Sequence, residues 1–206
     1  MARVDDYQAS FDISAQKLSD QNFAHVAQRS GGQVQNDGRS LIMDYYNRPV
    51  LVEQAPCRVT VMDQGPEIPL AEQALILHYL EMADGTPPTD QWIAFREVSG
   101  GEFYWSAYVR RANAPLLSFF GQRPDFLLEV APRLGGKTQN GIGDAAVVIP
   151  AFPLTSFLLV LWQGDEEFPP EANVLLDANV SHFLGTEDIA LAAGLSVYKL
   201  MALSKI

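Results

Sequence analysis

Cysteine is the scarcest chemically useful residue in this chain, since Cys57 is the only one among 206 residues. One cysteine excludes an internal disulfide. It also excludes, within one chain, a zinc or iron–sulfur centre held by several cysteines. Such cysteine use is typical of a reducing compartment. Residues 1–6 contain no apolar segment of the kind found in a signal peptide, so we expect a cytoplasmic protein.

Long apolar runs are also missing. The most apolar stretch, Val147 to Trp162, is interrupted by Pro150 and Pro153 and is too short to span a bilayer. The composition is nevertheless that of a globular protein, with 48% hydrophobic residues and a mean hydropathy of -0.00. We therefore expect a folded protein with no membrane association.

Basic residues are absent between Thr138 and Tyr198, although the same stretch holds eight of the acidic residues. The net charge is -11, which makes nucleic acid and anionic membranes poor partners because both require a basic surface. The acidic stretch favours a cation or a basic partner, or else it forms a solvated face without a ligand. The eight residues are Asp144, Asp165, Glu166, Glu167, Glu171, Asp177, Glu187 and Asp188.

Strand and helix signals alternate irregularly, which favours an α+β fold with a mixed or antiparallel sheet and packed helices. We expect a main domain over residues 69–206 preceded by a helix and hairpin region over 1–68, or one continuous domain. Residues 1–13 look loosely ordered. The expected strands are 41–46, 50–53, 58–62, 92–98, 144–149, 154–162 and 173–177, and the expected helices are 12–29, 69–83, 103–111, 116–120, 126–133 and 186–204.

No motif identifies a reaction. Leu134 to Thr138 matches only the end of a phosphate-binding loop, because Ala131 stands where the first glycine is needed. The chain lacks the His-Glu-x-x-His pattern of metalloproteases and the Gly-x-Ser-x-Gly pattern of hydrolases. We predict no catalytic residue, and the sequence names no cofactor.

The acidic turn, residues 163–170, is the strongest candidate site. Asp165, Glu166 and Glu167 follow a buried apolar run that ends at Trp162, and Phe168 and two prolines come next. In an extended segment Asp165 and Glu167 would share one face, where carboxylate oxygens suit Mg²⁺, Ca²⁺ or Mn²⁺.

Three interpretations of these carboxylates remain open. They bind a ligand or metal, with Asp177, His182, Glu187 and Asp188 as further candidate ligands. They form a catalytic pair in which one acid raises the pKa of the other. Or they form a structural turn in which carboxylates accept from backbone amides or pair with Arg96, Arg110 or Arg111.

The C-terminal half resembles a family of uncharacterised proteins found mainly in anaerobic bacteria and archaea. The resemblance covers residues from about 130 to 203, and the acidic turn is its most specific part. It implies no established activity. Some members of that family carry an iron–sulfur segment, which implies an anaerobic redox or metallocofactor setting; with Cys57 alone, this chain departs from those members. The segments that carry the resemblance are 134–136, 143–144, 149–150, 158–162, 164–169, 175–177, 182–184 and 186–188.

The sequence therefore favours a binding protein over an enzyme. The predicted ligand-binding residues are Asp165, Glu166, Glu167, Trp162 and Phe168, with Trp92 and Tyr104 as further aromatic candidates. The ligand would be a small molecule, a cofactor or a partner protein. The alternatives are a metal-dependent hydrolase or transferase centred on the same carboxylates, and a scaffold subunit of a larger complex.

Overall fold

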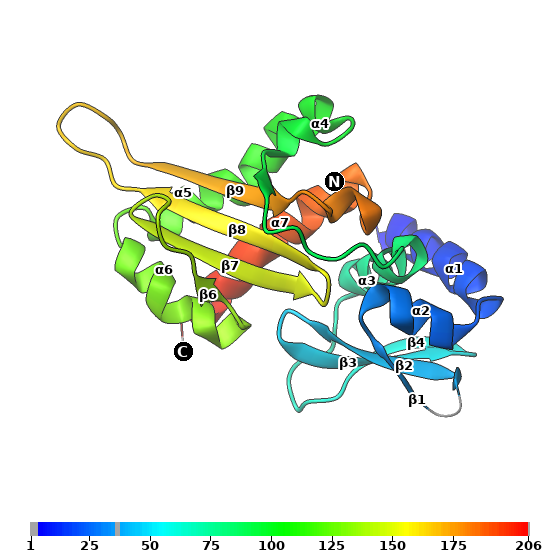
Figure 1. Ribbon diagram of the computed structural model, residues 1–206. Coiled ribbons are helices and arrows are strands. Elements are labelled where there is room, and N and C mark those ends of the chain that lie inside the picture. Colours follow the sequence, from blue (N-terminus) through cyan, green and yellow to red (C-terminus); the bar gives the residue numbers. More distant parts are fainter. Residues whose placement is uncertain (1–3, 36–37, 206) are drawn as a thin grey trace. The chain divides into compact units, whose positions relative to one another are not determined.

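The computed structural model describes residues 4–35 and 38–205 and confirms the α+β class (Figure 1). Contacts divide the chain into two compact units. Unit 1 is Met1–Pro87 with Phe152–Leu154 and His182–Leu184, and unit 2 is Pro88–Ala151, Thr155–Ser181 and Gly185–Ile206. The division after residue 68 that the sequence suggests stays a prediction. Among the described residues, no helix combines the length and the apolar character needed to cross a membrane.

Unit 1 begins with two helices where one was expected. Helix α1 (Val4–Ser19) starts well before Asp12, so the prediction of a loosely ordered segment is wrong from residue 4 onward; residues 1–3 lie outside the described residues. The chain then breaks, and α2 (Phe23–Ser30) starts at Asn22, whose side chain accepts from the backbone of Ala24 and His25. An Asn at this position satisfies amides that the new helix leaves free, which explains the break.

The four-stranded sheet of unit 1 has the order β1-β2-β3-β4 and is antiparallel throughout. The predicted hairpin over residues 41–53 is confirmed, with Tyr46 and Asn47 both at positive φ as a tight two-residue turn requires. The strands are β1 (Gln33–Gln35), β2 (Ser40–Tyr45), β3 (Arg48–Gln54) and β4 (Cys57–Val61).

Helix α3 (Leu70–Met82) confirms the helix expected after Pro69. Seven of its thirteen residues are buried, which is typical of a helix covered by other elements. Its buried Tyr79 stacks on Phe152 with ring centroids 4.2 Å apart and on Phe183 at 5.4 Å. These rings form the aromatic core of unit 1 and hold two short segments from the distant C-terminal half.

Unit 2 contains the five-stranded sheet with the order β5-β9-β8-β7-β6. Both edge strands are two residues long. The expected strand over 92–98 is wrong beyond Ile93, because a 3₁₀ turn (Phe95–Glu97) follows at once. The strands are β5 (Trp92–Ile93), β6 (Lys137–Thr138), β7 (Ala145–Phe152), β8 (Thr155–Trp162) and β9 (Glu171–Asp177).

A long helical path packs on one face of this sheet. Helix α4 (Gly101–Tyr108) widens into a π-helical turn (Val109–Asn113) before α5 (Ala114–Phe120). Pro115 explains the widening, because its ring would meet the carbonyl of Arg111 in a regular helix. The Tyr108 hydroxyl donates to the Val174 carbonyl at 2.7 Å and fixes the path to β9.

Two further helices complete unit 2, α6 (Pro124–Val130) and α7 (Thr186–Leu203), and Figure 1 shows α7 passing behind β7 and β8. A side chain at Gly194 of α7 would come within 2.9 Å of the Arg111 carbonyl, so the small residues at this point are needed for helix packing. The other face of the sheet, toward the viewer in Figure 1, carries no described helix of this unit.

Candidate functional site

The acidic turn connects two neighbouring strands of the sheet in unit 2, β8 and β9. Strand β8 ends at Trp162 and β9 begins at Glu171, and these two residues are paired across the ladder. Residues 163–170 leave the end of the sheet as a loop and return to it (Figure 1). The position explains why a buried apolar run is followed directly by three exposed carboxylates.

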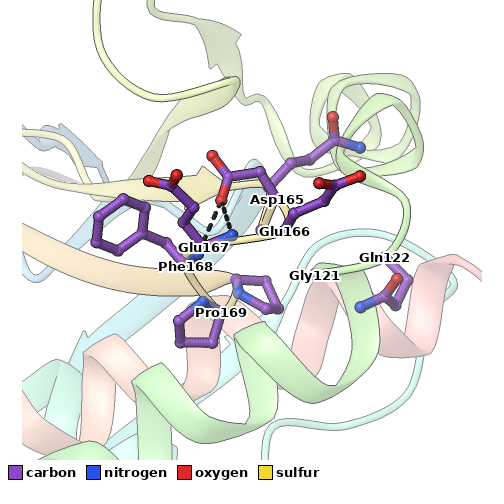
Figure 2. A pocket seen from close by; sticks show the side chains of 10 residues that line it. Gly121, Gln122, Asp165, Glu166, Glu167, Phe168 and Pro169 are labelled. Carbon is purple, nitrogen blue, oxygen red and sulfur yellow. Dashed lines mark hydrogen bonds between the residues drawn. The ribbon is translucent and has the colours of Figure 1, made fainter.

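Asp165 organises the turn. Its carboxylate accepts from the backbone N–H of Glu167 at 2.8 Å and of Phe168 at 2.7 Å (Figure 2). The Asp165 N–H in turn donates to the Phe168 carbonyl at 2.9 Å. The segment is bent rather than extended, so the prediction that Asp165 and Glu167 share one face of an extended chain is wrong.

The bonds that Asp165 receives from the Phe168 and Glu167 amides lower the pKa of its carboxyl group, because backbone N–H groups stabilise the ionised form. This is the structural role that the sequence left open, a carboxylate that accepts from backbone amides. The predicted pairing with arginine does not occur at Arg96, which pairs with Glu102 at 3.5 Å.

Gly164 allows the turn to close. A side chain at this position would lie 2.6 Å from the Pro170 nitrogen and 2.8 Å from the Phe168 carbonyl oxygen. Such contacts are too short for any Cβ atom, so the close approach of the two ends of the loop depends on glycine. Pro169 and Pro170 then stiffen the return to β9.

Glu166 and Glu167 remain available to a ligand. Both side chains are exposed and point away from the turn in different directions (Figure 2), and no ion pair found among the described residues involves either one. The turn and the end of α5 enclose an open hollow of about 490 Å³, to which Gly121 and Gln122 contribute. The hollow is large enough for a side chain of a partner or for a small polar molecule.

The further candidate ligands do not line this hollow. Asp177 is buried and accepts from Thr89, Asp90 and Asn179. His182 belongs to unit 1, where its Nδ1 lies 2.7 Å from Asp84. Within residues 4–35 and 38–205, no three Cys, His, Asp or Glu side chains gather in a way that would hold a metal ion.

The helix-free face of the sheet carries two tryptophans at opposite ends of β9, since Trp92 pairs with Asp177 and Trp162 with Glu171. We call this surface the tryptophan face. Ala146, Leu158 and Val160 are buried at its centre, and half-buried side chains pack around them. Trp162 was predicted as a site residue, and Trp92 comes from β5 at the edge of the sheet. The half-buried members are Trp92, Ile142, Val148, Trp162 and Leu175.

The other predicted aromatics are more exposed. Phe168 is 67% exposed at the tip of the acidic turn, and Tyr104 is 42% exposed on α4. The sequence-based reasoning missed Asp144, whose carboxylate accepts from the Gln163 N–H at 2.7 Å and anchors the start of the turn. Asp144 directly precedes a buried strand, as Asp165 follows one, and that placement was the available signal.

A family model described as a domain of unknown function, DUF3786, matches residues 22–199. The chain belongs to this family. The match confirms the resemblance to an uncharacterised family and extends it to most of the chain, while α1 lies ahead of it. Searches among the curated proteins and among the solved structures found no match. The DUF3786 assignment by itself carries no activity.

Proposed function

We propose that unit 2 of this DUF3786 protein is a binding module that docks a basic, partly apolar segment of a partner protein. The observation that carries the proposal is the position of Trp162. This residue is part of the tryptophan face and directly precedes the acidic turn, so one strand end joins an apolar surface to exposed carboxylates.

The tryptophan face supplies the affinity in this proposal. Aromatic side chains that are half-buried in the free protein can bury more area on binding and orient a partner through their rings. Trp92 and Trp162 are the two members of this kind, and both belong to the same apolar cluster. A partner that covered them would complete a face that lacks a helix.

The acidic turn supplies the charge preference. Glu166 and Glu167 are exposed, and neither takes part in an ion pair found among the described residues. A lysine- or arginine-bearing segment therefore fits this end of the sheet, and an acidic segment is repelled. Because the carboxylates are exposed, the attraction should weaken as salt is raised, since the screening length falls to about 8 Å at physiological ionic strength.

Two synthetic peptides test this proposal. One alternates lysine with leucine, and its matched counterpart alternates glutamate with leucine. We expect the lysine peptide alone to change the tryptophan fluorescence of the full chain, with an affinity that falls as salt rises. The double substitution Glu166→Gln and Glu167→Gln should weaken binding several-fold, whereas Glu97→Gln with Glu102→Gln, on the 3₁₀ turn and α4, should not.

A Trp162→Phe variant tests the tryptophan face separately from the acidic turn. It keeps an aromatic ring at this position and removes the fluorescence of Trp162. Binding of both peptides with equal affinity, or an affinity that neither charge substitution changes, would overturn the proposal.

The anaerobic redox or metallocofactor setting is a further expectation from the resemblance. Native mass spectrometry of protein purified without oxygen tests it, and a retained cofactor mass would favour a small molecule over a protein as the ligand.

A further inference from the structure

Strand β4 is an edge of the sheet in unit 1 and leaves one row of backbone groups without a strand partner in that sheet. The Met62 N–H donates to the Pro49 carbonyl at 2.9 Å, just beyond the paired residues Val61 and Val50. Hydrogen-bonded pairs alternate in an antiparallel ladder, so residues 58 and 60 also bond to β3. The N–H and C=O groups of Cys57, Val59 and Val61 therefore point away from β3.

The neighbouring strand confirms this alternation. The Gln54 N–H donates to the Arg39 carbonyl at 3.0 Å, which assigns the even-numbered residues of β3 to bonds with β2. The odd-numbered residues of β3 are then left for β4, in agreement with the bond at Pro49.

Space lies beside this edge. A hollow of about 240 Å³ is lined by all five residues of β4, together with Phe11, Glu67, Ile68 and Gln73. Val59 and Val61 pair with the buried Val52 and Val50, so their side chains lie on the face of the sheet that is directed to the core. An added strand would thus meet a row of hydrogen-bonding groups and a small apolar recess together.

We propose that β4 pairs with the β4 strand of a second copy of this chain, antiparallel and centred on Val59. The reason is that the edge is complementary to itself in this register. Val59 faces the second copy's Val59, and Cys57 faces the second copy's Val61 on the same side. The three residues with outward backbone groups then face each other across the new ladder.

The solvent side of the strand is also compatible with this register. Arg58 faces the second copy's Thr60, so no two like charges lie directly opposite, an arrangement that would be destabilising. A β-branched pair at the centre, Val59 against Val59, suits strand packing. The proposal lies in unit 1 and is independent of the function proposed for unit 2.

Cysteine cross-linking tests the register. In the proposed pairing two residues at position 59 are directly opposite, whereas two residues at position 61 are about 13 Å apart, four residue steps along the strands. Cys57 is the single native thiol of the chain, so it is replaced by serine where it is not needed.

With Cys57→Ser, we expect Val59→Cys to form a disulfide-linked dimer under mild oxidation and Val61→Cys to remain unlinked. Val61→Cys with Cys57 retained should link, because these two residues face each other between copies. Within one chain they are too far apart to bond. The same substitution thus gives opposite results with and without Cys57.

Sedimentation equilibrium of the unmodified full chain tests for the dimer without any substitution. We expect a dimer that dissociates on dilution. A monomer at every concentration, or equal cross-linking of Val61→Cys with and without Cys57, would overturn the proposal. If the Val59→Cys chain fails to fold, as circular dichroism would show, the two Val61→Cys chains still decide the register.

Discussion

Two aspartates of unit 2 perform the same task in opposite surroundings. Asp177, at the end of β9, is 1% exposed and accepts from the backbone N–H groups of Thr89, Asp90 and Asn179 at 3.0–3.1 Å. Asp165, in the acidic turn, accepts from two backbone N–H groups in solvent. The comparison teaches that the same bonds fix the fold where water is excluded and shape an accessible loop where it is not.

The difference follows from the cost of leaving amides without acceptors. Removal of the Asp177 carboxylate leaves backbone N–H donors without an acceptor in a region that water reaches poorly. Each buried unsatisfied group costs about 1–3 kcal/mol. Around Asp165, water replaces the lost acceptor at little cost. We therefore assign Asp177 to the architecture and Asp165 to the shape of the candidate site.

The comparison between Asp177 and Asp165 is tested most directly by removing each carboxylate in a separate variant. Asp177→Ala should lower the free energy of unfolding by about 2–4 kcal/mol, because the Asn179 amide and those of the loop around Thr89 lose their acceptor. Asp165→Ala should produce a much smaller change. Urea unfolding of the two variants measures this directly, and equal losses would show that burial does not separate the two sites.

Gly164→Ala tests whether the exposed turn has a preferred closed form. The new Cβ atom would meet the Pro170 nitrogen at 2.6 Å, so we expect the loop to open and the free energy of unfolding to fall by about 1–2 kcal/mol. Amide exchange at Phe168 and Asp165 should accelerate together. Unchanged exchange at both amides would mean that the turn accommodates a side chain without opening.

Thr89→Val removes one hydroxyl group next to the buried site. The Thr89 hydroxyl donates to Asp177 at 2.6 Å and accepts from the Gln91 N–H at 3.2 Å, and valine keeps its shape while removing both bonds. A loss of about 1 kcal/mol is expected on urea unfolding. Thr138→Val, at an exposed position of β6, is the matched control and should cost less. A larger loss in the control would indicate that the measured effect comes from valine itself.

Local signals predicted much of this fold. The apolar runs over 41–46 and 50–53 predicted the β2–β3 hairpin, and the expected helices over 69–83 and 186–204 match α3 and α7. These elements are set by residues close in sequence, so a single chain carries enough information. The continuous apolar run over 154–162 likewise predicted β8, most of whose residues are buried.

The site could be predicted only in its sequence-local part. Asp165, Glu166 and Glu167 are contiguous, so their accumulation was visible, but the bond that ties Asp177 to Thr89 spans residues far apart in the chain. Trp92 and Trp162 share one face of the sheet only through the order of its strands. The two interruptions that the sequence-based reasoning missed, at Asn22 and after Ile93, arise from single capping or turn residues within patterns that otherwise look continuous.

The pH dependence of the acidic turn gives the smallest expected effect and the most local one. The Glu167 and Phe168 amides lower the pKa of Asp165, so the ionised carboxylate favours the closed turn. A carboxyl group whose pKa is lower in the folded state contributes stability above its ordinary pKa, and that contribution is lost as the pH falls through the folded value. NMR chemical shifts of the two amides should therefore change at a pH below the usual range for an exposed aspartate.

Asp165→Asn keeps an acceptor oxygen but cannot titrate, so it should retain the turn and abolish the transition. A transition at the ordinary aspartate pKa would mean that the turn is open in solution, and that the exposed member of the comparison shapes nothing.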